Sequence, residues 1–351
     1  MSLLDRMLKA GAGNSQADIM SQSTVFTDRD VTPTKLPILN VALGGELAGG
    51  VSAGLTILAG VSKTFKSALT LYCMKAYLDK HSDAIGIFYD TEMGITNDYM
   101  QQFGIDTDRV VHITVDHVEQ LKFDMTKKLD EIKRGDRVFF MIDSIGQISS
   151  KKEVDDAVDE KSVADMTRAK ALRSFFRLVT IQLAKKNLPC IAVNHVYQTQ
   201  EMFSKTVVGG GTAVMYSANT ILIISKSQEK GSDGDLEGWN FNITVEKSRF
   251  VREKSKVSFL VDYEKGINLY SGILDLAIEG GFVIKPKNGW YQLVDKSTGE
   301  VLSGNVRAKD TENKEFLGKV LTNPEFNTFV KSQFKLQSNL NTSIEEDMEA
   351  V

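Results

Sequence analysis

Apolar residues occur along the chain in short continuous runs, and amphipathic stretches separate these runs from one another. Continuous apolarity, unlike strict alternation, indicates strands buried on both faces, as in a mainly parallel sheet covered by helices. The pattern therefore predicts an α/β fold. The expected strands are 55–59, 85–89, 110–114, 138–142, 191–194 and 221–225.

The pattern changes near both ends of this region. Residues 241–246 and 257–262 alternate between apolar and polar positions, which predicts an antiparallel, hairpin-like extension. A helix is expected at 273–280, followed by a compact mixed segment and an acidic tail at 344–351. We divide the chain into an N-terminal arm (1–35), a core (36–271) and a small C-terminal α/β domain (272–351).

The N-terminal arm begins with a short amphipathic stretch that places Leu4, Met7 and Leu8 on one helical face. A helix of this length is marginal in water. We therefore expect this helix to dock against another surface, either its own core or a neighbouring subunit. We favour the neighbouring subunit.

Composition narrows the class of protein. The chain has 351 residues, of which 42% are hydrophobic and 25% charged, which is ordinary for a globular protein. No apolar run could span a bilayer and the start lacks a secretory signal, so we expect no membrane contact and a cytoplasmic location. Cys73 and Cys190 are expected as buried thiols. The net charge of −4 gives no general nucleic-acid signal, so DNA binding would need a local patch.

A loop with phosphate-binding character follows the first expected strand and precedes a helix that runs through Leu78. Lys66 would reach the β- and γ-phosphates of a nucleotide, and the Ser67 hydroxyl would bind Mg²⁺. Phe65 stands where the motif has its second glycine, and a bulky residue strains any φ > 0 geometry. The other interpretation is a polar turn with a solvated lysine. The loop residues are Gly60, Val61, Ser62, Lys63, Thr64, Phe65, Lys66 and Ser67.

Polar residues end three other expected strands, at the sheet edge where ligands of α/β proteins bind. Asp143 would hold Mg²⁺ beside Ser67, although it could simply cap the next turn. Hydrolysis of a γ-phosphate needs a group that orients or deprotonates the attacking water, and Glu92 is the candidate for this role. Asp90 is the less favoured candidate and is more suited to bracing the loop. Asn194 or His195 could sense the γ-phosphate, or be an ordinary satisfied polar residue.

Residues 197–216 contain three successive glycines and read as a binding loop. Its backbone N–H groups, a lysine and an aromatic ring suit the phosphates and bases of single-stranded DNA, although a lid over the nucleotide is the alternative. Lys151 and Lys152, after the Asp143 strand, could lie near the axis of an assembly. The candidate DNA-binding residues of the loop are Met202, Phe203, Lys205, Gly209, Gly210 and Gly211.

The order of these motifs over nearly the whole chain resembles the RecA family, and within it the UvsX-type recombinases of tailed bacteriophages. The resemblance implies an ATP- and Mg²⁺-dependent protein that forms helical filaments on single-stranded DNA and pairs it with homologous double-stranded DNA. Phe65 suits the UvsX type. Mediator and single-strand-binding proteins would be further partners, and the location would be the host cytoplasm.

The resemblance also implies roles for individual residues. Tyr99 matches an adenine-stacking aromatic, although it could be a core tyrosine. His195 stands where bacterial RecA proteins carry a glutamine that couples the γ-phosphate to the DNA loop. Lys247 and Arg249 match cations that reach a neighbouring subunit's ATP, where they would stabilise charge on the phosphoryl oxygens. Segments 151–165 and 198–215 match the two DNA-facing loops.

The leading hypothesis is therefore a DNA-dependent ATPase that carries out strand exchange in phage recombination, repair and replication. A hexameric ring helicase shares this core but usually has a larger N-terminal domain. A small-molecule P-loop kinase would need arginines in its lid, and the glycine-rich loop has none. A non-catalytic paralogue is the third alternative, motivated by Phe65.

Overall fold

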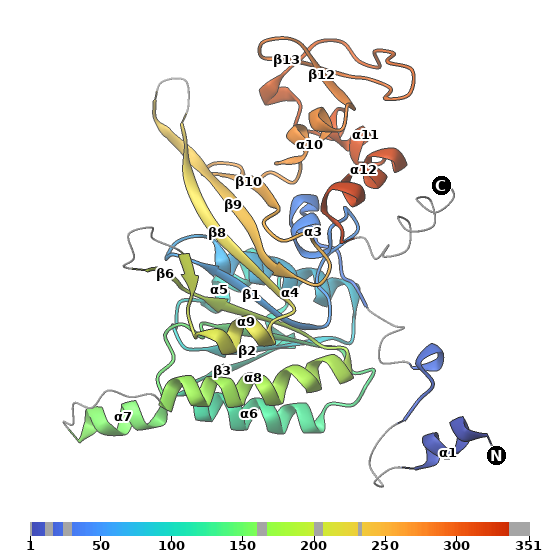
Figure 1. Ribbon diagram of the computed structural model, residues 1–351. Coiled ribbons are helices and arrows are strands. Elements are labelled where there is room, and N and C mark those ends of the chain that lie inside the picture. The colour runs from blue at the N-terminus through green and yellow to red at the C-terminus, as the bar shows by residue number, and fades with distance from the viewer. Residues whose placement is uncertain are drawn as a thin grey trace.

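The computed structural model describes residues 2–10, 17–23, 30–159, 167–199, 206–230 and 234–336. A nine-stranded sheet forms its centre, in the order β11-β10-β9-β8-β1-β5-β4-β2-β3 (Figure 1). The strands are β1 (Gly54–Gly60), β2 (Ile85–Asp90), β3 (Val110–Thr114), β4 (Val138–Asp143), β5 (Pro189–Asn194), β8 (Thr220–Lys230), β9 (Leu236–Ser248), β10 (Lys256–Asp262) and β11 (Gly266–Ile267).

The six strands from β8 to β3 in this order are parallel, which confirms the predicted α/β fold. Strands β1, β4 and β5 are buried along their whole length, as their continuous apolarity indicated. The prediction of burial on both faces was wrong for β3, where Val111 is 44% exposed. This strand lies at the end of the sheet, so only one neighbour covers it.

Two hydrophobic cores lie on opposite faces of the sheet. One contains residues of α3 (Pro37–Gly44), α4 (Lys66–Lys80) and α5 (Asn97–Gln102), and extends into the C-terminal segment. The other contains residues of α6 (Val118–Glu131), α8 (Thr167–Lys186) and α9 (Thr212–Ser217). Cys73 belongs to the first core and Cys190 to the second, so both are buried thiols as predicted.

Strands β9 and β10 form the predicted antiparallel extension, and β8 pairs with β9 in the same antiparallel way. Strands β8 and β9 are longer than the sequence pattern indicated. The predicted helix at 273–280 is α10 (Ile273–Glu279). A three-stranded antiparallel sheet follows it. The C-terminal elements are β12 (Val283–Lys287), β13 (Trp290–Leu293), β14 (Val306–Arg307), η3 (Ala308–Asp310), α11 (Leu317–Leu321) and α12 (Pro324–Phe334).

Short elements complete the described chain. Helix α1 (Leu3–Lys9) buries no residue, and Leu4 and Met7 are 53% and 56% exposed. Its apolar face therefore finds no cover among the described residues of its own chain. No described helix is long and apolar enough to cross a membrane. The remaining elements are η1 (Met20–Gln22), η2 (Thr107–Arg109), α7 (Lys151–Val158), β6 (Val196–Gln198) and β7 (Thr206–Val208).

Candidate functional site

The phosphate-binding loop joins the buried end of β1 to the start of α4. Lys63 and Phe65 both have left-handed backbone angles, with φ of 61° and 65°. Lys66 is only 6% exposed, and its ammonium donates to the Val61 carbonyl at 2.8 Å and to the Thr64 hydroxyl at 3.4 Å. Burial lowers the pKa of Lys66, and the nearby charges of Asp143 and Glu92 partly offset that effect.

Phe65 adopts the conformation that the motif's glycine would adopt freely, as the sequence had suggested. A left-handed non-glycine residue costs about 1–2 kcal/mol. Its ring packs against Phe241 of β9 and Phe259 of β10, with centroids 5.1 and 6.2 Å apart. Each aromatic pair contributes about 0.5–1.5 kcal/mol beyond area burial, so the packing offsets the backbone strain.

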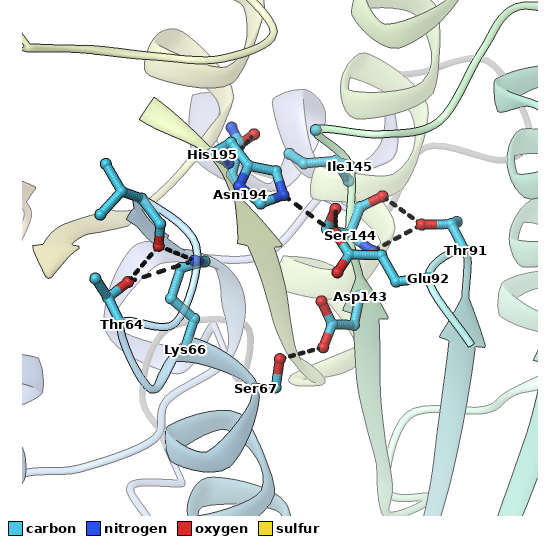
Figure 2. A network of polar contacts seen from close by, with 12 residues as sticks. Thr64, Lys66, Ser67, Thr91, Glu92, Asp143, Ser144, Ile145, Asn194 and His195 are labelled. Carbon is cyan, nitrogen blue, oxygen red and sulfur yellow. Dashed lines mark hydrogen bonds and ion pairs between the residues drawn. The ribbon is translucent and has the colours of Figure 1, made fainter. Parts of the chain in front are cut away.

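Ser67 and Asp143 meet at the carboxyl edge of the sheet, as predicted. The Ser67 hydroxyl donates to Asp143 Oδ2 at 2.5 Å, whereas buried Asp143 Oδ1 has no hydrogen-bond partner (Figure 2). The pKa of Asp143 is raised to about 6, mainly by burial. The negative charges of Glu92 and Asp90 also raise it, whereas the hydrogen bond from Ser67 and the positive charge of Lys66 lower it.

A hydroxyl beside a carboxylate with an unused oxygen fits Mg²⁺, which commonly takes one or two protein ligands plus substrate phosphates and water. Within the described residues, no group of three or more His, Cys, Asp or Glu side chains could hold a metal without a substrate. Any Mg²⁺ here would therefore depend on the nucleotide for its remaining ligands.

Glu92 lies beside this pair, just past the end of β2. Its Oε1 accepts from the Ser144 hydroxyl at 2.5 Å and lies 3.2 Å from His195 Nε2 (Figure 2). Burial raises the pKa of Glu92, but the hydrogen bonds from Ser144 and His195 and the charge of Lys66 outweigh it, so the net shift is downward. Glu92 is thus an ionised carboxylate near the phosphate loop, as a group that orients water requires.

Asp90 braces the turn that carries Glu92. It is 2% exposed, and its Oδ1 accepts from the backbone N–H groups of Glu92 at 3.0 Å and Met93 at 2.8 Å. Its other oxygen lies 3.1 Å from His112 Nε2 on β3. This geometry matches the bracing interpretation of Asp90 rather than contact with water at the site.

A cavity of about 340 Å³ brings the predicted residues of the phosphate site together. A larger cavity of about 570 Å³ adjoins it and shares Phe65 and Tyr99. Sequence reasoning missed the larger cavity, whose apolar walls come from α4, α5, β10 and β11. The smaller cavity is lined by Ser62, Lys63, Thr64, Phe65, Lys66, Ser67, Ala68, Glu92, Tyr99, Asp143, Val193 and His195.

Tyr99 is half-buried, and its ring contacts Phe103 edge-on at 5.2 Å. Phe103 in turn contacts Tyr72 at 5.5 Å. Tyr99 therefore belongs to an aromatic cluster and also faces both cavities, so its two predicted interpretations are compatible.

His195 connects the site to the glycine-rich loop. The Gly209 N–H donates to the His195 carbonyl at 2.9 Å, and Asn194 Nδ2 donates to the Gly209 carbonyl at 2.8 Å. Gly210 and Gly211 have φ of 84° and 70°, which only glycine adopts easily. The glycine run is therefore fixed at one end to the residue that contacts Glu92.

The other candidate DNA-binding residues are less well defined. Met202, Phe203 and Lys205 lie outside the described residues. Lys151 and Lys152 begin α7 and are exposed, and the Lys152 ammonium pairs with Asp156.

Lys247 and Arg249 do not join the phosphate site of their own chain. Lys247 pairs with Ile221 of β8, which pairs with Ile57 of β1. This register places it two strands, about 10 Å, to the side of β1 and three residues, about 10 Å, behind Gly60. The Lys247 ammonium donates to the carbonyls of Met215 and Tyr216 at 2.6 and 3.3 Å. Burial lowers the pKa of Lys247, and Arg249 lowers it further.

Two known protein domain families together match most of the chain. Residues 12–268 match the RecA N-terminal domain, and residues 270–330 match the C-terminal domain of the bacteriophage T4 recombination and repair protein. The recombination and repair protein of Enterobacteria phage T4 is 48% identical over 338 residues, covering 95% of this chain and 86% of that protein.

Bacterial relatives are more distant. Protein RecA of Streptomyces ambofaciens is 26% identical over 265 residues, covering 75% of this chain and 68% of the relative. Protein RecA of Borreliella burgdorferi is 26% identical over 300 residues, covering 83% of this chain and 79% of the relative. The alternative of a ring-forming helicase finds no support in these comparisons.

Proposed function

The chain belongs to the RecA family of recombinases, and from this premise we propose that it is a DNA-dependent ATPase acting in phage recombination and repair. It assembles into a helical filament on single-stranded DNA and pairs that strand with a homologous duplex. The observation that carries the proposal is the convergence of Lys66, Ser67, Glu92 and Asp143 on one cavity, with Lys247 and Arg249 held away from it.

The cavity residues divide the chemistry among them. The Lys66 ammonium donates to the Val61 carbonyl, and the β- and γ-phosphates of ATP would take the place of that partner. Ser67 and Asp143 would hold Mg²⁺, which would neutralise charge on the phosphate oxygens. Glu92 orients the attacking water with the carboxylate oxygen that Ser144 and His195 leave available.

The larger cavity suits the adenine base. It adjoins the phosphate cavity at Phe65 and Tyr99, and apolar side chains such as Val261 and Ile267 form much of its wall. An apolar site next to convergent polar groups is the usual arrangement for a nucleotide. Tyr99 stacks on the base or flanks it.

The site is completed by a second protomer. A cation at the transferring phosphoryl group stabilises the charge that develops there. Lys247 and Arg249 supply this charge to a neighbour, because neither lines the phosphate cavity of its own chain and the strand register separates Lys247 from its own phosphate loop. A head-to-tail contact that repeats without closing produces a helical filament. The exposed face of α1 provides a further contact between protomers.

DNA lies along segments 151–165 and 198–215 of successive protomers. Lysines contact its phosphates, and the backbone N–H groups of Gly209, Gly210 and Gly211 add further donors. Mediator and single-strand-binding proteins complete the set of partners, and the host cytoplasm is the site of action.

ATP turnover with and without single-stranded DNA tests the proposal. Turnover should rise sharply with DNA, free phosphate should be the product, and Glu92→Gln should abolish the rise. Turnover indifferent to DNA at every protein concentration would refute it. A phosphorylated metabolite in place of free phosphate would instead indicate a kinase. No change on Glu92→Gln in any activity would indicate a non-catalytic paralogue.

A further inference from the structure

The segment 144–148, between β4 and α7, contacts both Glu92 and His195. The Ser144 hydroxyl donates to Glu92 Oε1 at 2.5 Å. Gly146 presents its Cα to the His195 ring, because a Cβ there would lie 2.6 Å from His195 Cδ2. The position of this segment therefore decides where the carboxylate of Glu92 and the ring of His195 can lie.

Arg168, in the first turn of α8, holds this segment in place. Its Nε donates to the Ile148 carbonyl at 2.6 Å, and its Nη2 donates to the carbonyls of Ile145 and Gly146 at 3.0 and 2.9 Å. Ile145 and Ile148 are 1% and 2% exposed. One planar guanidinium thus satisfies three carbonyls of a single turn with donors held in a rigid fork, a geometry that a lysine ammonium lacks.

The guanidinium of Arg168 serves segment 144–148, because it satisfies three of the segment's main-chain carbonyls. Arg168 also follows the segment 151–165 that we assign to DNA, whereas the link from His195 to Gly209 belongs to the second DNA-facing segment.

We propose that Arg168 is a positioning residue that couples the first DNA-facing segment to Glu92 through Ser144. The inference rests on the proposed function, since it requires turnover that responds to DNA. When DNA binds the first DNA-facing segment, the guanidinium holds the carbonyls of Ile145, Gly146 and Ile148 in place. The Ser144 hydroxyl then holds the Glu92 carboxylate in the orientation that directs water. This route is separate from the one through His195 and Gly209.

Arg168→Lys tests the coupling, because it keeps the charge and removes the fork. We expect the ratio of turnover at saturating single-stranded DNA to turnover without DNA to fall on the order of tenfold. DNA affinity, measured by fluorescence anisotropy, should stay within about twofold. The matched control is Arg173→Lys on the exposed face of the same helix, which should leave the ratio unchanged.

A double-mutant cycle with Ser144→Ala tests the route. If Arg168 acts through Ser144, Arg168→Lys lowers the ratio little further in the Ser144→Ala background. Ser144→Ala should also move the acid limb of the pH–rate profile upward, because it removes a hydrogen bond that lowers the pKa of Glu92. A merely structural role would not move that limb.

Four outcomes would overturn the inference. The first is an unchanged ratio in folded Arg168→Lys protein. The second is weakened DNA binding with a normal ratio at saturation, which would make Arg168 a DNA contact. The third is full additivity with Ser144→Ala. If thermal unfolding shows that Arg168→Lys does not fold, the test rests on Ser144→Ala alone. The fourth outcome is then an unchanged turnover ratio in Ser144→Ala protein. Absence of DNA stimulation in the unmodified chain would refute the proposed function instead.

Discussion

Asp143 should destabilise the nucleotide-free protein at neutral pH, although the proposed ATPase depends on it. Burial raises its pKa from 3.8 to about 6, so the folded protein holds the proton more tightly than the unfolded chain does. A raised pKa of an acid contributes stability that is complete below the unfolded value and lost as pH rises through the folded value. The carboxylate therefore costs up to about 3 kcal/mol at pH 7.5, from about two pKa units at 1.36 kcal/mol each.

Asp143→Asn removes this pH-dependent cost. The free energy of unfolding of Asp143→Asn should exceed that of the unmodified chain at pH 7.5. This excess should be about 1.5 kcal/mol smaller at pH 5. The amide of the Asp143→Asn variant puts an unpaired N–H donor where Oδ1 of Asp143 is unpaired, which has its own energetic cost. This cost is the same at both pH values, so it cancels when the two pH values are compared. In thermal unfolding without nucleotide or Mg²⁺, the advantage in Tm should shrink by roughly 2 °C over this range.

Glu92→Gln is the matched control, because the net pKa shift of Glu92 is downward. A lowered pKa contributes stability that is present above the unfolded pKa and lost as pH falls. Glu92→Gln should therefore lose stability at pH 7.5, and the deficit should shrink towards acid pH. Both variants should lose turnover. A pH-independent difference for Asp143→Asn, or the same sign for both variants, would refute the electrostatic reasoning about this site.

Three further predictions concern assembly and DNA. Lys247→Ala and Glu92→Gln should each be inactive alone, but mixed protomers should regain about a quarter of normal turnover, since one interface in four combines an intact Glu92 with an intact Lys247; a mixture as inactive as its parts would contradict completion between protomers. Deletion of residues 1–30 should abolish filaments in electron micrographs while circular dichroism still reports a folded core, and filaments of normal length would refute the role of α1. Lys205→Ala should weaken binding to all single-stranded sequences alike and reduce the salt dependence of binding, measured by anisotropy, whereas a sequence-selective loss would argue against base-tolerant contacts.

Much of the fold could be predicted because buried parallel strands carry a strong sequence signal. The runs that became β1, β4 and β5 are apolar throughout, and their lengths and ends were predicted closely. Strand β3 has a similar composition but lies at the sheet edge, and edge position depends on strand order rather than on local sequence. The length of the β8–β9 hairpin was likewise underestimated, because its outer part is polar.

The phosphate site could be predicted where motif residues meet at strand ends, as Ser67 and Asp143 do. The packing of Phe65 against Phe241 and Phe259 could not, because the three residues are far apart in sequence and only the antiparallel extension brings them together. The same holds for the contacts of Arg168, whose three acceptors are main-chain carbonyls and leave no sequence pattern. The division into three domains stays a prediction.

The position of Lys247 and Arg249 in an assembled filament is the most direct test of the account. A cryo-EM map of the chain with single-stranded DNA and a non-hydrolysable ATP analogue would show both cations and the nucleotide. We predict that Lys247 and Arg249 of one protomer contact the phosphates bound by Lys66 and Ser67 of the next. Filaments in which both cations lie far from every nucleotide would contradict completion of the site between protomers.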